Sequence, residues 1–117
     1  MYSARLMELF HTRVHGGDLA DPTHAADAGV PGQGPYIRFA FRAHDGVVET
    51  ARWKTYGCPA AMACAEAACE WSEGRSLAEL SSATPDLVTE WVGGVPEGKE
   101  HCPALAAQGL CAVQPVP

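Results

Sequence analysis

The sequence predicts an α+β domain in which a small antiparallel sheet of two or three strands is followed by four helices packed on it. Residues 36–43 alternate between apolar and polar side chains, and residues 47–56, which follow a His44-Asp45-Gly46 turn, are rich in β-branched and aromatic residues, so the two segments predict a hairpin. Residues 60–73 are rich in alanine, which favours a helix. Further helix-start signals follow, and strands followed by helices are typical of the α+β class.

The part of the chain before the hairpin divides into two segments. Leu6, Met7 and Phe10 stand at helical spacing, which predicts a short amphipathic helix that docks on the domain. Residues 15–35 hold five glycines and three prolines, and we expect them to form a long irregular or mobile segment.

The first helix after the hairpin is the best defined of the four. Residues 60–73 place Glu66, Glu70 and Glu73 on one side of the helix, and Gly74 ends it. The opposite side carries Ala60, Cys64, Ala68 and Trp71.

Three shorter helices are predicted after it. A capping box at residues 76–79 starts one, and Thr84 before a proline starts the next. The last helix opens at Pro103 and is expected to be weak because Gly109 interrupts it.

Composition limits the classes of function. The 117 residues form one domain, 1–117, which is large enough to fold without metal or disulfides. The formal net charge of -6, with only eight Lys and Arg, argues against a nucleic-acid partner. No secretory signal or membrane span is present, so we expect a cytoplasmic protein with no membrane partner. Five cysteines then predict free thiols, ligands or reactive sulfur rather than a disulfide framework.

Two Cys-Pro-Ala tripeptides, which begin at Cys58 and Cys102, carry the chemistry of the chain. Proline is favoured at the first position of a helix, so each cysteine is predicted to be an N-cap. A thiol at that position has a lowered pKa, which favours the thiolate that binds metals or attacks sulfur. His101 directly precedes the second cysteine. If the two helix starts converge, Cys58, His101 and Cys102 form a site with three ligands.

These residues, read with their neighbours, resemble the IscU/NifU N-terminal family of iron–sulfur cluster assembly scaffolds. The resemblance runs from the first residues to about Leu110 and includes Tyr2. It is carried mainly by Gly46-Val47-Val48-Glu49-Thr50-Ala51-Arg52-Trp53-Lys54-Thr55-Tyr56-Gly57-Cys58, by Glu70-Trp71 with Gly74 and Ser76-Leu77, and by Lys99-Glu100-His101-Cys102.

The resemblance implies a non-enzymatic protein on which a [2Fe–2S] cluster is built and then passed to recipient apo-proteins. It also implies a cysteine desulfurase as the partner that supplies persulfide sulfur. The second and third family cysteines correspond to Cys58 and Cys102, and the family histidine corresponds to His101.

The chain departs from the family pattern at three places. The first family cysteine falls at Gly32 and a nearby aspartate at Gly34, and glycine cannot ligate a metal. The family's chaperone motif falls on residues 95–99 and keeps one proline and the lysine only, which weighs against recruitment of an ATP-driven heat-shock chaperone. The final helix is also shorter than in the family. These departures indicate a divergent or specialised member.

A [2Fe–2S] cluster and a tetrahedral zinc ion each need four donors, and Cys58, His101 and Cys102 supply three. Water, an exogenous thiol, the second protomer of a homodimer or another residue of the chain are alternatives for the fourth. Within the chain, Cys64 and His24 are the weaker candidates. The other histidine and the aspartates of residues 15–35 are expected to be solvated, and the other two cysteines to be structural or incidental; these residues are His15, Asp18, Asp21, Asp27, Cys69 and Cys111.

Three functions therefore stay open at this point. The first is a scaffold or carrier that holds iron, sulfur or a [2Fe–2S] cluster. The second is a zinc- or iron-binding accessory protein of the assembly machinery that builds no cluster. The third is a persulfide acceptor in which Cys102 receives sulfur and His101 accepts a proton.

Overall fold

The computed structural model describes residues 2–117, and it confirms the α+β fold. The sheet is antiparallel and has the strand order β3-β2-β1-β4. It therefore has four strands rather than two or three, because β1 and a two-residue β4 join the predicted hairpin. The strands are β1 (His24–Gly29), β2 (Tyr36–His44), β3 (Val47–Tyr56) and β4 (Gln114–Pro115).

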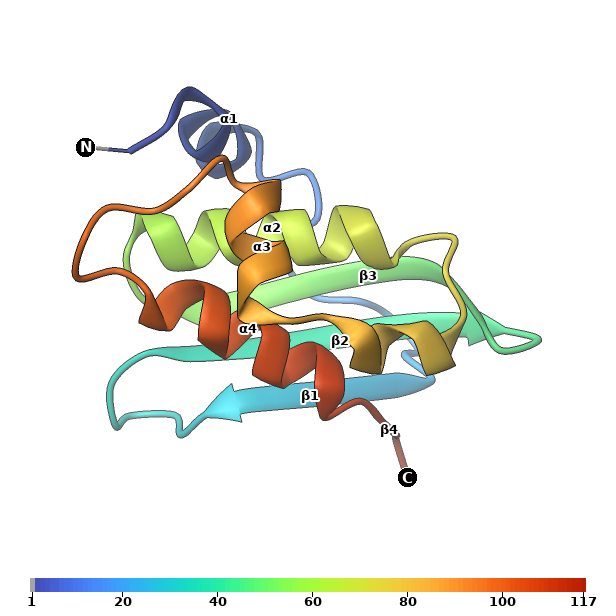
Figure 1. The fold of residues 1–117 in the computed structure, drawn as a ribbon. Coiled ribbons are helices and arrows are strands. Elements are labelled where there is room, and N and C mark those ends of the chain that lie inside the picture. Colours follow the sequence, from blue (N-terminus) through green and yellow to red (C-terminus); the bar gives the residue numbers. More distant parts are fainter. Residues whose placement is uncertain (1) are drawn as a thin grey trace.

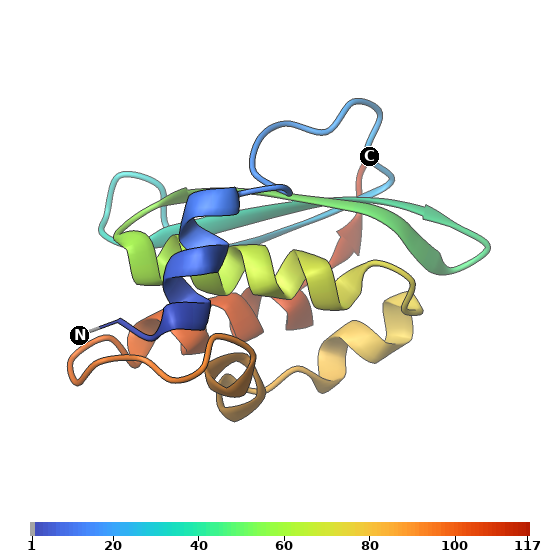
Figure 2. The same cartoon turned by 90° about the horizontal axis from the view of Figure 1, so that it is seen from above.

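The helices cover one face of this sheet (Figures 1 and 2). Helix α1 precedes the sheet, and the predicted set of four follows β3. Among residues 2–117, no helix is both long enough and apolar enough to cross a membrane. The helical segments are α1 (Ala4–Thr12), α2 (Pro59–Ser72), the 3₁₀ segment η1 (Leu77–Ser82), α3 (Pro85–Trp91) and α4 (His101–Cys111).

The predicted hairpin is confirmed and forms the centre of the fold. Tyr36 pairs with Tyr56 at one end and His44 with Val47 at the other. Asp45 and Gly46 both have positive φ angles, as a tight hairpin turn requires. The apolar face of β2 is buried, and it consists of Ile37, Phe39 and Phe41.

Strand β1 corrects the expectation that residues 15–35 are irregular throughout. His24–Gly29 pairs with β2 along its whole length, and Ala26 and Ala28 point into the core. The strand escapes notice in the sequence because its inward side chains are alanines, which have low strand propensity, and glycines and prolines surround it. Mobility of the rest of the segment stays a prediction.

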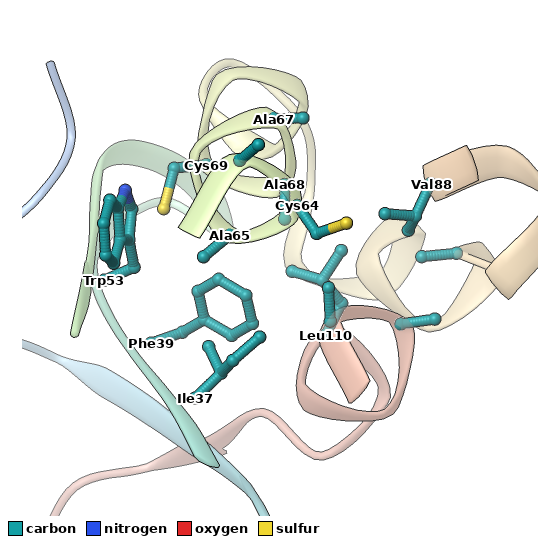
Figure 3. Packing of buried hydrophobic residues seen from close by; sticks show 14 of the residues in the cluster. Ile37, Phe39, Trp53, Cys64, Ala65, Ala67, Ala68, Cys69, Val88 and Leu110 are labelled. Atoms are coloured by element: carbon teal, nitrogen blue, oxygen red, sulfur yellow. The ribbon is translucent and has the colours of Figure 1, made fainter. Parts of the chain in front are cut away.

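Helix α2 crosses the inner face of the sheet. Its alanines are almost all fully buried, so the helix backbone lies close to the strands. Figure 3 shows Phe39 of β2 beneath Ala65 of α2, with Leu110 of α4 to one side. One continuous apolar core therefore joins the sheet to α2 and α4.

Helix α4 is longer than predicted, because Gly109 does not interrupt it. The helix runs from His101 through Gly109 to Cys111. A Cβ atom at residue 109 would lie 2.7 Å from Cε2 of Phe39, well inside van der Waals contact. Glycine is therefore the residue that lets α4 approach the sheet.

The helix-start signals of the two short helices are confirmed. Thr84 Oγ1 accepts a hydrogen bond from the Leu87 N–H at the start of α3. Ser76 and Glu79 form the predicted capping box, although the segment that follows is a 3₁₀ helix rather than an α-helix. Local capping thus fixes where each short helix begins.

Candidate functional site: a pair of thiols between two helices

The two Cys-Pro-Ala cysteines lie side by side. Helices α2 and α4 begin at the same end of the sheet, next to the loop that joins β1 to β2 (Figure 1). The Sγ atoms of Cys58 and Cys102 are 3.8 Å apart. The predicted convergence of these two residues, which are 44 positions apart in the sequence, is thus present in the structure.

Cys58 has the environment that the sequence predicts. It is the N-cap of α2, with Pro59 in the first turn, and its side chain is partly exposed. Burial alone would raise the pKa of the Cys58 thiol. The backbone N–H groups of Ala61 and Ala60, the Cys102 thiol and the charge of Lys99 outweigh burial and lower this pKa below its ordinary value. Cys58 is therefore the more easily ionised thiol of the pair.

Cys102 differs from its prediction in two respects. The N-cap of α4 is Glu100, so Cys102 lies inside the first turn, where its N–H bonds to the Lys99 carbonyl. The side chain is also completely buried. Burial, the negative charge of Cys58 and the hydrogen bond with Cys58 raise the pKa of Cys102 to about 12. The prediction of a lowered pKa is wrong for Cys102, because the interior disfavours a second thiolate beside the first.

His101 lies next to the pair but does not complete a ligand set. Its Nε2 atom is 3.5 Å from the Sγ atom of Cys102, while the ring is exposed. Within residues 2–117, no three His, Cys, Asp or Glu side chains are arranged so that they could hold one metal ion. The structure therefore presents a preformed pair of thiols with an adjacent imidazole.

The two positions that the resemblance marks as lost ligands lie beside this pair. Gly32 and Gly34, with Pro35, Tyr56 and Gly57, line a hollow of about 470 Å³, and Gly57 directly precedes Cys58. A Cβ atom at either Gly32 or Gly34 would meet nothing within 4 Å. Glycine has no side chain, so neither Gly32 nor Gly34 provides a side-chain ligand at this hollow.

Neither candidate for a fourth ligand is well placed. Cys64 lies near the pair, but it is fully buried, and burial raises its pKa far above the ordinary thiol value. His24 begins β1, whereas the thiols lie at the far end of that strand, beyond Gly29. Five residues of extended chain separate His24 from Gly29, a span of about 17 Å. His24 is therefore excluded as a direct ligand by its position.

The other two cysteines lie away from the pair. Cys69 is fully buried near Glu66 and Glu73, and burial raises its pKa well above the ordinary value. Cys111 is exposed at the end of α4, where its thiol donates to the carbonyls of Ser81 and Ala83. Both fit the structural roles expected from the sequence.

A buried cluster of charged groups was not anticipated from the sequence. His15 belongs to the segment before β1, and its side chain packs against α2. Its Nδ1 is 2.6 Å from Oε2 of Glu66, and its Nε2 is 2.9 Å from Oε1 of Glu73. Glu66 is fully buried and also accepts hydrogen bonds from the indole of Trp53 and from the His15 backbone N–H. His15 is thus part of the core rather than a loop residue facing solvent.

Comparison with known proteins agrees with this architecture. Residues 1–114 match the family described as the NifU-like N-terminal domain, and the chain belongs to this family. The iron–sulfur cluster assembly scaffold protein IscU 1 of Archaeoglobus fulgidus is 32% identical over 110 residues, which cover 94% of this chain and 72% of that protein. IscU of Azotobacter vinelandii is 30% identical over 115 residues, which cover 95% and 89% of the two chains.

Solved structures share the fold at lower identity. The N-terminal part of a NifU-like protein from Brucella abortus superposes with a TM-score of 0.68 at 19% identity, covering 93% of this chain and 88% of that one. A candidate scaffold of the SUF system from Fervidobacterium islandicum gives a TM-score of 0.75 at 12% identity, covering 93% of both chains. The arrangement of sheet and helices is therefore that of this family.

Proposed function

We propose that this protein is an iron–sulfur cluster assembly scaffold or carrier that binds iron and sulfur through Cys58 and Cys102, with His101 as an auxiliary ligand. The observation that carries the proposal is the 3.8 Å approach of the two Sγ atoms at the helix starts. Relatives described as cluster assembly scaffolds support it, since they align with nearly the whole chain.

The donor set fits part of a cluster site. Thiolates are the usual protein ligands of iron–sulfur clusters, and an imidazole replaces a thiolate in some of them. Cys58 and Cys102 supply two thiolates, and rotation of the exposed His101 ring would add a nitrogen. One chain therefore falls at least one donor short of the four that a [2Fe–2S] cluster takes. Water, an exogenous thiol or the second protomer of a homodimer completes the set in this proposal.

The partners follow from the same proposal. A cysteine desulfurase supplies persulfide sulfur, and recipient apo-proteins take the product. Cys58 is the accessible member of the pair, so the sulfur donor is expected to contact Cys58 first. A cluster held by few protein donors leaves readily, which suits a carrier better than a storage protein.

The donor shortfall also favours a second candidate function. A single zinc or iron ion bound tetrahedrally needs only three protein ligands if water takes the fourth position. The absence of side-chain ligands at Gly32 and Gly34 favours such an accessory role, in which the protein binds metal without building a cluster.

Anaerobic reconstitution with iron and inorganic sulfide tests the proposal. Visible absorbance, circular dichroism and metal and sulfide analysis are recorded for the wild type, for Cys58→Ser and for Cys102→Ser. Cys111→Ser is the matched control, because Cys111 is an exposed thiol at the other end of α4. We expect a chromophore that contains sulfide in the wild type and the control and not in the other two variants.

The alternative has a distinct signature. Uptake of one iron or zinc ion per chain without sulfide would reject the scaffold and establish the accessory function. A chromophore that survives both Cys58→Ser and Cys102→Ser would reject the assigned ligands.

A further inference from the structure

The two thiols differ in what can reach them. Cys58 is partly exposed at the mouth of the site, whereas Cys102 is completely buried behind it. An incoming sulfur donor can therefore contact the Sγ atom of Cys58 and cannot contact that of Cys102. Sequence reasoning pointed to Cys102 as the acceptor, and the burial reverses that order.

The geometry points to an internal sulfur relay: Cys58 accepts a sulfur atom as a persulfide, and Cys102 then attacks Cys58 and releases that sulfur as sulfide. This inference rests on the proposed function and adds to it the order of the two thiols and the source of the reducing electrons. The 3.8 Å separation of the Sγ atoms places the second thiol in contact with the first.

The relay balances in two steps. In the first, the Cys58 thiolate attacks the outer sulfur of a donor persulfide, an S–S bond of the donor breaks, and the donor leaves as a thiolate. In the second, the sulfur of Cys102 attacks Sγ of Cys58, the bond to the outer sulfur breaks, and that sulfur leaves as HS⁻ with the proton from Cys102. The outer sulfur is reduced by two electrons, and the two thiols are oxidised to a disulfide.

Of the two neighbours of the pair, His101 takes part in this scheme and Cys64 does not. His101 Nε2 is 3.5 Å from Sγ of Cys102 and can carry the proton that leaves with the sulfide. Cys64 is buried in the core beside Val88 (Figure 3) and is not needed. A dithiol reductant must reopen the disulfide before the next turnover, since a disulfide holds no metal.

The experiment uses the full chain carrying Cys111→Ser, because Cys111 is an exposed thiol that would also accept sulfur. One equivalent of glutathione persulfide is added without oxygen, and an alkylating agent stops the reaction. Intact mass, released sulfide and peptide mapping are measured in this background, and again after adding Cys58→Ser, Cys102→Ser, Cys102→Ala or Cys64→Ala. Circular dichroism checks that each variant is folded, and two substitutions at residue 102 guard against a failure of one to fold.

We expect the background protein to lose the mass of two hydrogens, to release one sulfide per chain and to yield a Cys58–Cys102 disulfide peptide. The Cys102 variants should keep the mass of one added sulfur on Cys58 and release no sulfide. Cys58→Ser should acquire no sulfur, and Cys64→Ala should behave as the background does.

Three outcomes would overturn the relay: sulfur acquired by Cys102 in Cys58→Ser, undiminished sulfide release in folded Cys102 variants, or a disulfide that maps to Cys64. Reconstitution with inorganic sulfide bypasses the persulfide altogether. A protein that builds a cluster from sulfide but fails these tests would retain the proposed function and lose only the relay. A protein that passes them and binds no iron would retain the relay as sulfur chemistry alone.

Discussion

Replacement of Glu66 tests whether His15 is held as a buried cation. Both ring nitrogens of His15 face carboxylate oxygens, Nδ1 at 2.6 Å from Glu66 and Nε2 at 2.9 Å from Glu73. A neutral imidazole has one donor nitrogen, so it would turn a lone pair toward one of these carboxylates. Both contacts are favourable only when both nitrogens carry protons. Arg52 lies 3.6 Å from Glu73 and balances the second carboxylate.

Glu66→Ala should be strongly destabilising. The carboxylate accepts three hydrogen bonds in the core, from the Trp53 indole, the His15 backbone N–H and the His15 ring. Removing one partner of a buried charged pair costs roughly 3–5 kcal/mol, since the remaining groups stay desolvated and unpaired. The total free energy of unfolding of a domain of this size is roughly 5–15 kcal/mol. The midpoint of thermal unfolding should therefore fall by roughly 10–20 °C.

Glu66→Gln is the matched control, because its side chain has the same shape. The amide oxygen can accept from Trp53 and from the His15 backbone, while the amide N–H can donate to Nδ1 of a neutral His15. Nε2–H of the same ring then donates to Glu73. Every group keeps a partner, so the free energy of unfolding should change by only about 1–2 kcal/mol.

The two proteins should differ in how stability depends on pH. Burial alone lowers the pKa of His15, but the hydrogen bonds and charges of Glu66 and Glu73 outweigh it and raise this pKa above its ordinary value. A raised histidine pKa contributes stability that is fully present below about pH 6.5, the pKa in the unfolded chain. That stability is lost as the pH rises through the folded pKa, with a slope of at most about 1.4 kcal/mol per pH unit.

Urea unfolding from about pH 6 to about pH 9 measures this difference. The wild type minus Glu66→Gln difference in the free energy of unfolding should decline with rising pH, since other titrating groups are common to both proteins and cancel. Parallel curves would refute the assignment of a charged His15. Glu66→Ala should have a lower free energy of unfolding than the wild type and Glu66→Gln at every pH. Near-wild-type stability of this variant would show that the cluster contributes little.

Three further predictions follow from other parts of the structure. Gly109→Ala gains up to about 1 kcal/mol of helix propensity, but its Cβ would lie 2.7 Å from Phe39. Urea unfolding should therefore show a net fall of about 1–2 kcal/mol in the free energy of unfolding, whereas the control Gln108→Ala, at an exposed position, should leave it unchanged. Gly32→Cys has space for its side chain but a positive φ that costs about 1–2 kcal/mol, and it should lengthen the lifetime of a reconstituted chromophore followed by absorbance. Cys64→Ala should leave metal uptake unchanged by metal analysis, at a stability cost of about 1 kcal/mol.

The central part of the fold is predictable from local patterns. The hairpin is defined by alternation of Ile37, Phe39 and Phe41 with polar residues, and the helix starts by capping residues such as Thr84. Strand β1 cannot be predicted from local patterns, because its alanines carry no strand preference and its pairing is determined by β2. The prediction that Gly109 interrupts the last helix is wrong for a related reason. The role of Gly109 depends on Phe39, which is seventy positions away in the sequence.

The site shows the same division between local and tertiary information. The helix-capping signal predicts Cys58 as an N-cap, and the proline after each cysteine leads to the hypothesis that the two helix starts converge. Only the packing of α4 shows that Cys102 lies within the first turn and is buried. The burial of Glu66 was equally inaccessible, since nothing near it in the sequence indicates that His15 and Trp53 will converge on its carboxylate.

The positions of the retained and lost donors explain how the fold can persist while the site changes. Cys102 is fully buried in the core, and Cys58, the N-cap of α2, packs against that core. Gly32 and Gly34 lie in a loop where an added Cβ touches nothing within 4 Å, so side chains can be lost there without cost to the core. The site thus pairs a buried thiol with an accessible one, an arrangement that permits the proposed sulfur exchange but supplies fewer than the four donors that a [2Fe–2S] cluster takes.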